Sequence, residues 1–122
     1  MIVKHFHHKY GHTFMFSPND MTIRHPVGGF NFDVCDGGKQ FHLESVHIAR
    51  AFRGRGYGKE MIVDAVNKAR ELGAKVLTLW VFPSNKKAIH IYELAGFKQG
   101  PCDDYDGNLV FMKTEVPHET CT

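Results

Sequence analysis

Residues 53–60 read "RGRGYGKE", and three glycines alternate there with basic residues directly before an apolar, helix-like run. Apolar side chains then recur at helical spacing from Met61 until Gly73, which predicts an amphipathic helix that ends at that glycine. Glycines at the start of a helix let backbone N–H groups approach an anion, and the helix N-terminus adds partial positive charge. Because Arg53, Arg55 and Lys59 add full charges at the same point, the stretch predicts a pyrophosphate site.

Other glycine-rich motifs fit the spacing less well. A Walker A loop needs Ser or Thr after its lysine, where this chain has Glu60, and a dinucleotide-binding GxGxxG needs glycine where this chain has Lys59. An arginine–glycine RNA-binding tract is normally repeated, whereas this stretch occurs once. A plain tight turn would need one glycine rather than three. The formal net charge of +2 gives no further reason to expect nucleic acid as a partner.

Short strand-like runs precede the glycine stretch. Runs rich in β-branched and aromatic residues, separated by turn formers, predict strands at 2–7, 13–16, 21–24, 30–34 and 41–48. The sequence "CDGGK" at 35–39 predicts a tight hairpin turn between the last two of these runs.

The second half alternates strands with a helix. The apolar run 75–82 predicts a buried strand, and Ser84 or Asn85 is expected to cap a second helix that closes at Gly96. Two further strands are predicted within 97–100 and 108–116. These elements predict one α+β domain over residues 1–122, in which a mixed, mostly antiparallel twisted sheet carries two main helices.

Composition narrows the class of protein. The chain has 122 residues, 43% of them hydrophobic, and no apolar run approaches the roughly 20 residues of a membrane helix. The first residues lack the pattern of a secretory signal, so we expect a cytoplasmic protein without membrane contact. The three cysteines, Cys35, Cys102 and Cys121, are expected to be free thiols, since their number is odd and their spacing wide.

Two linked motifs resemble those of a known family. Arg53, Gly56 and Gly58 match the R/Q-x-x-G-x-G/A signature with which the GNAT family of N-acetyltransferases binds acetyl-CoA. The stretch "GAKVLTLWVFPSNKKAIHIYELAGF" at 73–97 is similar to the family's second motif, including Asn85 and Tyr92. The resemblance covers residues 41–100.

The resemblance implies an enzyme that moves the acetyl group of acetyl-CoA to a primary amine by direct attack, without a metal. Acetyl-CoA would lie in a V between the strand ending at Ile48 and the strand beginning at Val76. The residues that it implies for the cofactor are Val46, His47, Ile48, Arg53, Gly54, Arg55, Gly56, Tyr57, Gly58, Lys59, Asn85 and Ala88. The backbone N–H near Ile48 would polarise the thioester carbonyl.

Proton transfer needs an acid and a base. The resemblance assigns the acid to Tyr92, although helical spacing alone also fits a core tyrosine. Many relatives use a glutamate as base on the strand after the first helix, but the matching position here is Trp80. By period two, His42, Glu44, Val46 and Ile48 share one strand face, which makes Glu44 or His42 the candidate base. An exposed strand carboxylate fits Glu44 equally well.

The chain departs from the family near its N-terminus. Relatives usually place two helices between their first and second strands, whereas turn formers before Lys39 leave no amphipathic segment for them. We therefore expect an open acceptor site, suited to a protein, peptide or small-molecule amine, or one completed by a second copy in a homodimer. Asp103, Asp104 and Asp106 would attract a cationic amine or form a solvated turn. An acyl-CoA-binding sensor or interaction module with little turnover is the alternative function.

Four histidines, His5, His7, His8 and His12, lie close to the N-terminus. Imidazole binds zinc readily, but no cysteine or carboxylate completes a ligand set. We expect these histidines to be solvated or to pack against one another.

Overall fold

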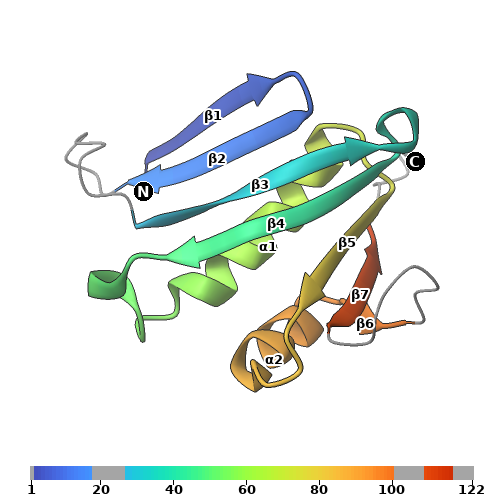
Figure 1. Ribbon diagram of the computed structural model, residues 1–122. Coiled ribbons are helices and arrows are strands. Elements are labelled where there is room, and N and C mark those ends of the chain that lie inside the picture. The colour runs from blue at the N-terminus through green and yellow to red at the C-terminus, as the bar shows by residue number, and fades with distance from the viewer. Residues whose placement is uncertain (1, 18–26, 101–108, 117–122) are drawn as a thin grey trace, which may run out of the picture.

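The computed structural model describes residues 2–17, 27–100 and 109–116, which form one seven-stranded sheet with helices packed on it (Figure 1). The strands are β1 (Ile2–His8), β2 (Gly11–Ser17), β3 (Gly28–Cys35), β4 (Gln40–Ile48), β5 (Val76–Val81), β6 (Lys98–Gln99) and β7 (Val110–Glu115). The helices are α1 (Tyr57–Glu71) and α2 (Lys86–Leu94), and short 3-10 turns occur at Asp36–Gly38 and Arg50–Phe52. The strand predicted at 21–24 lies outside the described residues.

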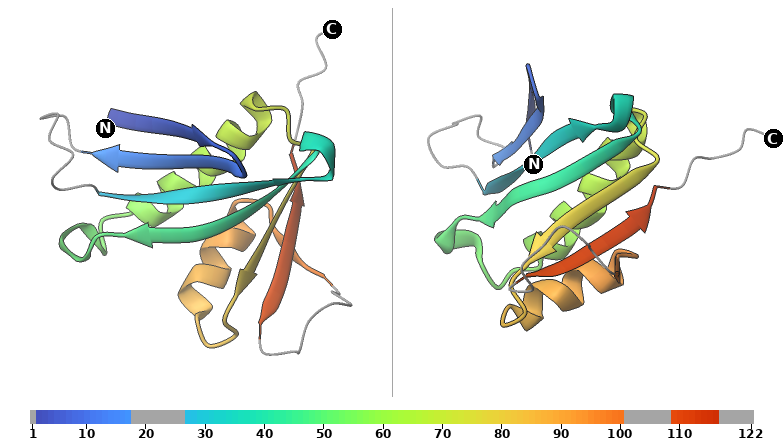
Figure 2. Two further views of the ribbon diagram at one scale, coloured as in Figure 1. Left: turned by 45° about the horizontal axis from the view of Figure 1, so that its top comes forward. Right: turned by 45° about the vertical axis from the view of Figure 1, so that its right-hand side comes forward.

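The strands lie in the order β1-β2-β3-β4-β5-β7-β6, and every neighbouring pair is antiparallel except β4 and β5. Helix α1 connects these two parallel strands and crosses one face of the sheet behind β3 and β4 (Figure 2). The predicted fold class, a mostly antiparallel mixed sheet with two main helices, is confirmed. The hairpin predicted at 35–39 joins β3 to β4.

The two helices begin and end close to the predicted residues. The sequence predicts helix α1 after Gly58, and the helix begins two residues before Lys59, at Tyr57. Helix α2 is capped by Asn85, whose side-chain oxygen accepts a hydrogen bond of 3.3 Å from the backbone N–H of Ala88. The described part of the chain contains no helix that is long and apolar enough to cross a bilayer.

The core lies between the helices and the sheet and is rich in aromatic rings. Phe32 contacts Phe30 at a ring-centroid distance of 5.1 Å and Phe41 at 5.3 Å. Helix α1 meets these strands with small side chains, because Ala65 and Ala69 are fully buried on its inner face. Burying each large apolar side chain stabilises the fold by about 1.5–3 kcal/mol, so this cluster fixes α1 firmly against β3 and β4.

Only Lys9 and Tyr10 separate β1 from β2, which pair along their whole length. The described residues therefore contain no helix pair between these two strands, as the turn formers in the sequence predict. Within residues 2–17, 27–100 and 109–116, the outer face of the sheet, opposite α1, therefore carries no helix between β1 and β2.

A bulge at Ser45 interrupts the alternation of side chains along β4. Ser45 has a φ of +55°, in the left-handed region that favours glycine. The pairing with β3 shifts at this point, so that Asn31 lies opposite Glu44 but Gly29 lies opposite His47. One extra residue on one strand of a pair is a β-bulge, which bends the strand and changes its register.

The bulge corrects the expectation that four residues of β4 share one face. His42 and Glu44 alternate with the buried Leu43 and lie on the outer face. Beyond Ser45 the phase is inverted, and Val46 and Ile48 pack against the core on the helix side. The prediction from period two was wrong for these two residues, because the inserted residue turns each later side chain to the other face.

The bulge should make position 45 sensitive to the type of side chain. Valine is strained at positive φ and glycine is not, so we expect Ser45→Val to lower the free energy of unfolding by about 1–3 kcal/mol. Ser45→Gly should leave it within about 1 kcal/mol. Urea denaturation of both variants measures the difference, and a valine variant as stable as the wild type would contradict the bulge.

Candidate functional site

The parallel strands β4 and β5 pair only over their first residues. The pairing runs from Gln40 with Val76 to Leu43 with Leu79, and the two strands then diverge into a V (Figure 1). Beyond Leu43 no strand of the described residues pairs with the edge of β4 that faces β5. Such an edge presents backbone donors and acceptors that an extended ligand can bind.

A pocket of about 700 Å³ lies between the end of β4, the start of α1 and the start of α2. It is lined by Val46, His47, Ile48, Phe52, Arg53, Gly54, Gly56, Tyr57, Gly58, Lys59, Asn85, Lys87, Ala88 and Ile91. The structure thus brings together the residues expected for the cofactor, apart from Arg55. Phe52, Lys87 and Ile91 also line the pocket and were not expected there.

The glycines of the loop have separate roles. Gly54 and Gly56 have φ values of +79° and +82°, so both adopt a backbone conformation that other residues rarely take. Gly58 has no such φ, and a β-carbon at this position would make an ordinary contact of 3.6 Å with Ile91. A tight turn therefore explains two of the three glycines. The third, Gly58, leaves the first turn of α1 without a side chain at this position.

The N-terminus of α1 is open to a ligand. Gly56 caps the helix without a side-chain hydrogen bond, so no side chain of the cap residue occupies the N–H groups of the first turn. Those groups and the helix dipole face the pocket between Gly56 and Lys59. This arrangement suits the oxygen atoms of a phosphate or pyrophosphate.

Two of the three basic side chains near the loop contact the protein itself. Arg53 donates a hydrogen bond of 3.0 Å from Nε to the carbonyl oxygen of Ile48, which ties the loop to the end of β4. The guanidinium group of Arg55 lies 5.8 Å from the centre of the Phe52 ring. Lys59, which lines the pocket, adds its charge at the start of the helix.

A second hollow of about 220 Å³ opens where β4 and β5 diverge, and both Glu44 and Tyr92 line it. Tyr92 is only 8% exposed, and burial raises the pKa of its phenol. The hydroxyl therefore stays protonated, which is the form of a proton donor. Trp80 also lines the hollow, and its ring lies 5.0 Å from that of Phe111.

The two candidate bases have different surroundings. Burial raises the pKa of Glu44, and the neighbouring charge of Asp33 and a hydrogen bond from it act in the same direction. His42 is hydrogen-bonded through Nδ1 to Thr78 Oγ1 at 2.9 Å, and burial lowers its pKa. His42 is not among the residues that line the hollow with Tyr92, whereas Glu44 is. The geometry therefore favours Glu44 over His42 as the candidate base.

The N-terminal histidines pack against one another and against the core. His5 Nε2 and His12 Nδ1 are 2.8 Å apart, and the ring of His7 stacks on that of His12 with centroids 4.5 Å apart. His12 is buried, and its pKa is lowered by burial and by the neighbouring histidines.

One of the three cysteines that are predicted to be free thiols lies in the described residues: Cys35 is exposed and free. The other two, Cys102 and Cys121, lie outside the described residues, as do the aspartates at 103, 104 and 106.

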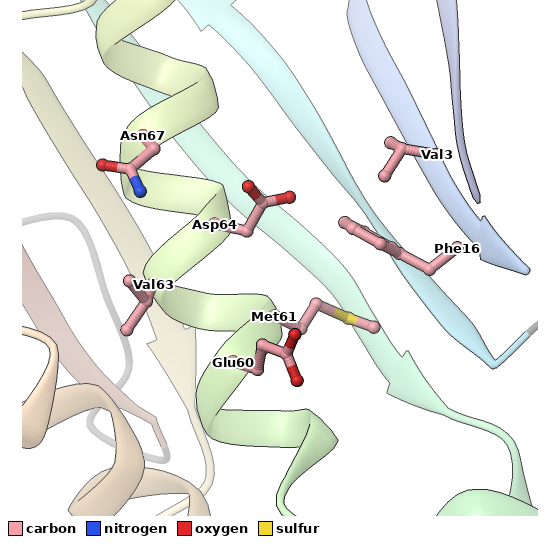
Figure 3. A pocket seen from close by; sticks show the side chains of 7 residues that line it. All are labelled: Val3, Phe16, Glu60, Met61, Val63, Asp64 and Asn67. Carbon is pink, nitrogen blue, oxygen red and sulfur yellow. The ribbon is translucent and has the colours of Figure 1, made fainter. Parts of the chain in front are cut away.

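A separate depression of about 300 Å³ lies between α1 and the β1–β2 edge (Figure 3). It is lined by Val3, Phe16, Glu60, Met61, Val63, Asp64 and Asn67. Burial raises the pKa of Asp64, and Lys68 acts in the opposite direction from 4.0 Å away. This depression shares none of its lining residues with the pocket at the V.

Comparison with known proteins places the chain among acetyltransferases. The sequence model of the Acetyltransferase (GNAT) family matches residues 3–97. An uncharacterized N-acetyltransferase of Methanocaldococcus jannaschii is 34% identical over 82 residues, which are 61% of this chain and 35% of that protein. This chain therefore spans about a third of the length of that relative.

Solved structures share the fold. Nourseothricin acetyltransferase superposes with a TM-score of 0.69 at 28% identity, over 88% of this chain and 66% of that one. A Bacillus subtilis acetyltransferase in complex with CoA superposes with a TM-score of 0.73 at 15% identity, over 88% of this chain and 78% of that one. The second likeness is one of fold alone.

The lowered pKa of His42 predicts a pH dependence of stability. The unfolded chain takes up a proton on this histidine below an ordinary pKa of about 6.5, whereas the half-buried His42 of the folded protein does so only at lower pH. Stability therefore falls as the pH falls through this window. We expect His42→Gln to lose less stability than the wild type between about pH 7.5 and about pH 5.5. Urea denaturation at both pH values measures this difference. His12→Gln separates the contribution of His12, which has the same sign, and an imidazole of His42 that titrates at its ordinary pKa would contradict the prediction.

Proposed function

The chain belongs to the GNAT family of acetyltransferases, and on that premise we propose that it transfers the acetyl group of acetyl-CoA to a primary amine in a ternary complex. The observation that carries the proposal is the pocket at the V. One cavity collects an unpaired strand edge, the bare N-terminus of a helix and a glycine loop, which are the groups that a long ligand with a pyrophosphate would need.

The pyrophosphate, the pantetheine arm and the thioester of acetyl-CoA would each contact a different part of this opening. The pyrophosphate would accept hydrogen bonds from the amides between Arg53 and Lys59, close to the N-terminal end of α1. The pantetheine arm would pair with the free edge of β4 from Val46 to Ile48, as an added strand does. The acetyl thioester would then lie at the apex of the V, beside Tyr92 and Glu44.

The reaction exchanges one bond and needs three proton transfers. The amine nitrogen attacks the thioester carbonyl carbon after its ammonium form gives a proton to Glu44, directly or through a water. The backbone N–H near Ile48 stabilises the charge on the carbonyl oxygen. The new C–N bond forms as the C–S bond breaks, and the departing CoA thiolate takes the proton of the Tyr92 hydroxyl. The acylated nitrogen then loses its second proton, which restores the Tyr92 hydroxyl directly or through water.

The acceptor would enter from the outer face of the sheet, where Glu44 lies. The described residues place only a two-residue turn between β1 and β2, so this side is open within one chain. Such an opening fits a protein or peptide amine, a bulky small molecule, or a second copy of the chain that completes the wall. The carboxyl group of Glu44 favours a cationic acceptor in each case.

Gly58 offers a test of the cofactor site that spares the fold. Its φ is ordinary and a β-carbon fits in the space, so Gly58→Asp should fold, and an acidic residue in the first turn favours the helix. The added carboxylate would occupy and repel the pyrophosphate site. We expect calorimetric titration to show acetyl-CoA binding weakened by about tenfold or more in this variant, equivalent to about 1.4 kcal/mol.

The matched control for this titration is Gly58→Ala, which adds a β-carbon without charge. It should bind acetyl-CoA within about threefold of the wild type, or about 0.7 kcal/mol. Equal affinity of the aspartate variant and the wild type would contradict the pyrophosphate site. A folded wild-type protein that does not bind acetyl-CoA would refute the proposed function itself.

Tyr92 separates transfer from simple binding. If its hydroxyl protonates the leaving thiolate, Tyr92→Phe should lower kcat by about 10²–10⁴-fold and leave the affinity for acetyl-CoA nearly unchanged. The phenylalanine ring keeps the packing against Phe97, whose ring lies 5.8 Å away. Release of free CoA thiol with an amine acceptor measures turnover. An acyl-CoA-binding protein without turnover would show the same low rate in both forms.

A further inference from the structure

Asp33 on β3 and Glu44 on β4 are diagonal neighbours on the outer face of the sheet. The β3–β4 register places Asn31 opposite Glu44 and Asp33 opposite His42. Long side chains reach each other across such a diagonal. The charge of the Asp33 carboxyl group and side-chain hydrogen bonding with it both raise the pKa of Glu44. Two carboxyl groups form a direct hydrogen bond only when one of them carries a proton, so a proton taken up by Glu44 can be held between the two groups.

The surroundings of this pair favour the uptake of a proton by Glu44. Burial raises the pKa of Glu44, and the charge and hydrogen bond of Asp33 raise it further. On the same strand, burial lowers the pKa of His42, and the charge of Asp33 acts in the opposite direction. Asp33 therefore acts on both candidate bases from one position.

The other polar side chains to consider around Glu44 are those of His47, Lys113 and Tyr92. His47 on β4 has its Nδ1 2.9 Å from the carbonyl oxygen of Ser45. Lys113 on β7 lies opposite Thr78, which is the hydrogen-bond partner of His42. The phenol of Tyr92, from α2, lines the hollow that Glu44 also lines. Of these groups and Asp33, it is Asp33 whose charge and side-chain hydrogen bonding raise the pKa of Glu44.

We propose that Asp33 is a positioning residue for Glu44: it holds the Glu44 carboxyl group at the outer rim of the β4–β5 opening and shares with it the site that receives the acceptor's proton. Asp33 does not line the hollow with Glu44 and Tyr92, so it acts through Glu44. The carboxyl pair makes Glu44 a stronger base than a solvated strand glutamate, because the proton that it takes up is held by two groups.

The role in the reaction rests on the proposed acetyl transfer. The ammonium group of the acceptor gives its proton to the ionised Glu44 carboxylate, and the Asp33 carboxylate then accepts a hydrogen bond from the protonated Glu44. The free amine attacks the thioester carbon as before, and the proton leaves to solvent after the product departs. The atoms and charges balance without another reactant.

The first test measures the carboxyl pair without any activity. Carbon-13 NMR of the side-chain carboxyl groups follows the titration of Glu44, whose signal is identified by its loss in Glu44→Gln. In Asp33→Asn we expect the pKa of Glu44 to fall, because the charge and the shared hydrogen bond are removed. The pKa of His42 should fall in the same variant, since the charge of Asp33 no longer raises it.

The matched control is Asp36→Asn, which removes the same charge at the hairpin turn that joins β3 to β4. Asp36 has a φ of +48°, which asparagine tolerates well, so this variant should fold. It should leave the pKa of Glu44 unchanged. A Glu44 that titrates at the same pH in Asp33→Asn as in the wild type would overturn the proposal.

The second test is a double-mutant cycle on turnover. Asp33→Asn should lower kcat/KM by about tenfold and move the acidic limb of its pH profile to lower pH. In a Glu44→Gln background the same change should have almost no effect, because Asp33 acts through Glu44. Equal losses in both backgrounds would overturn the positioning role. A wild type without turnover, together with a lowered Glu44 pKa in Asp33→Asn, would refute the proposed function and leave the carboxyl pair intact.

Discussion

The rest of the site depends on the point where β4 and β5 stop pairing. Strands in the middle of a sheet normally satisfy their backbone groups on both edges, and leaving such groups unpaired costs free energy. Here the pairing ends at Leu43 and Leu79, in the middle of the sheet rather than at its rim. Under the proposed function an extended ligand fills this gap, and the pantetheine arm restores the missing hydrogen bonds.

The bulge at Ser45 gives the two sides of this opening different chemistry. On the helix side it turns Val46 and Ile48 toward the core and the N-terminus of α1, where an apolar wall meets bare amides. On the outer side it leaves Glu44 beside Asp33. A single extra residue thus separates a surface suited to a nucleotide-bearing thioester from one suited to a cationic amine. A thioester at the apex would be reached from both sides.

Much of the fold could be predicted from the sequence, because helical and strand periods are local. The helix after the glycine stretch, the Asn85 cap and the hairpin at 35–39 all follow from short patterns. The bulge could not be predicted, since "FHLESVHI" continues its period-two pattern without a glycine at Ser45. The Asp33 neighbour could have been found by counting back from the hairpin turn. Phe52 and Lys87 could not, since only tertiary packing brings them to the pocket.

Two of the three basic side chains of the loop contact the protein itself, so their number overstates the charge that is free to meet a ligand. The Arg53 side chain is bonded to the carbonyl oxygen of Ile48, and Arg55 lies over the Phe52 ring, so both hold the loop in shape before any ligand arrives. Lys59 and the backbone amides are left to meet an anion. Oriented amides cost little to organise on binding, whereas free surface cations gain only screened attraction. Under the proposed function, the affinity of this loop for a pyrophosphate should therefore come mainly from its geometry, which the two arginines maintain. It should also depend on salt less steeply than three free charges would imply.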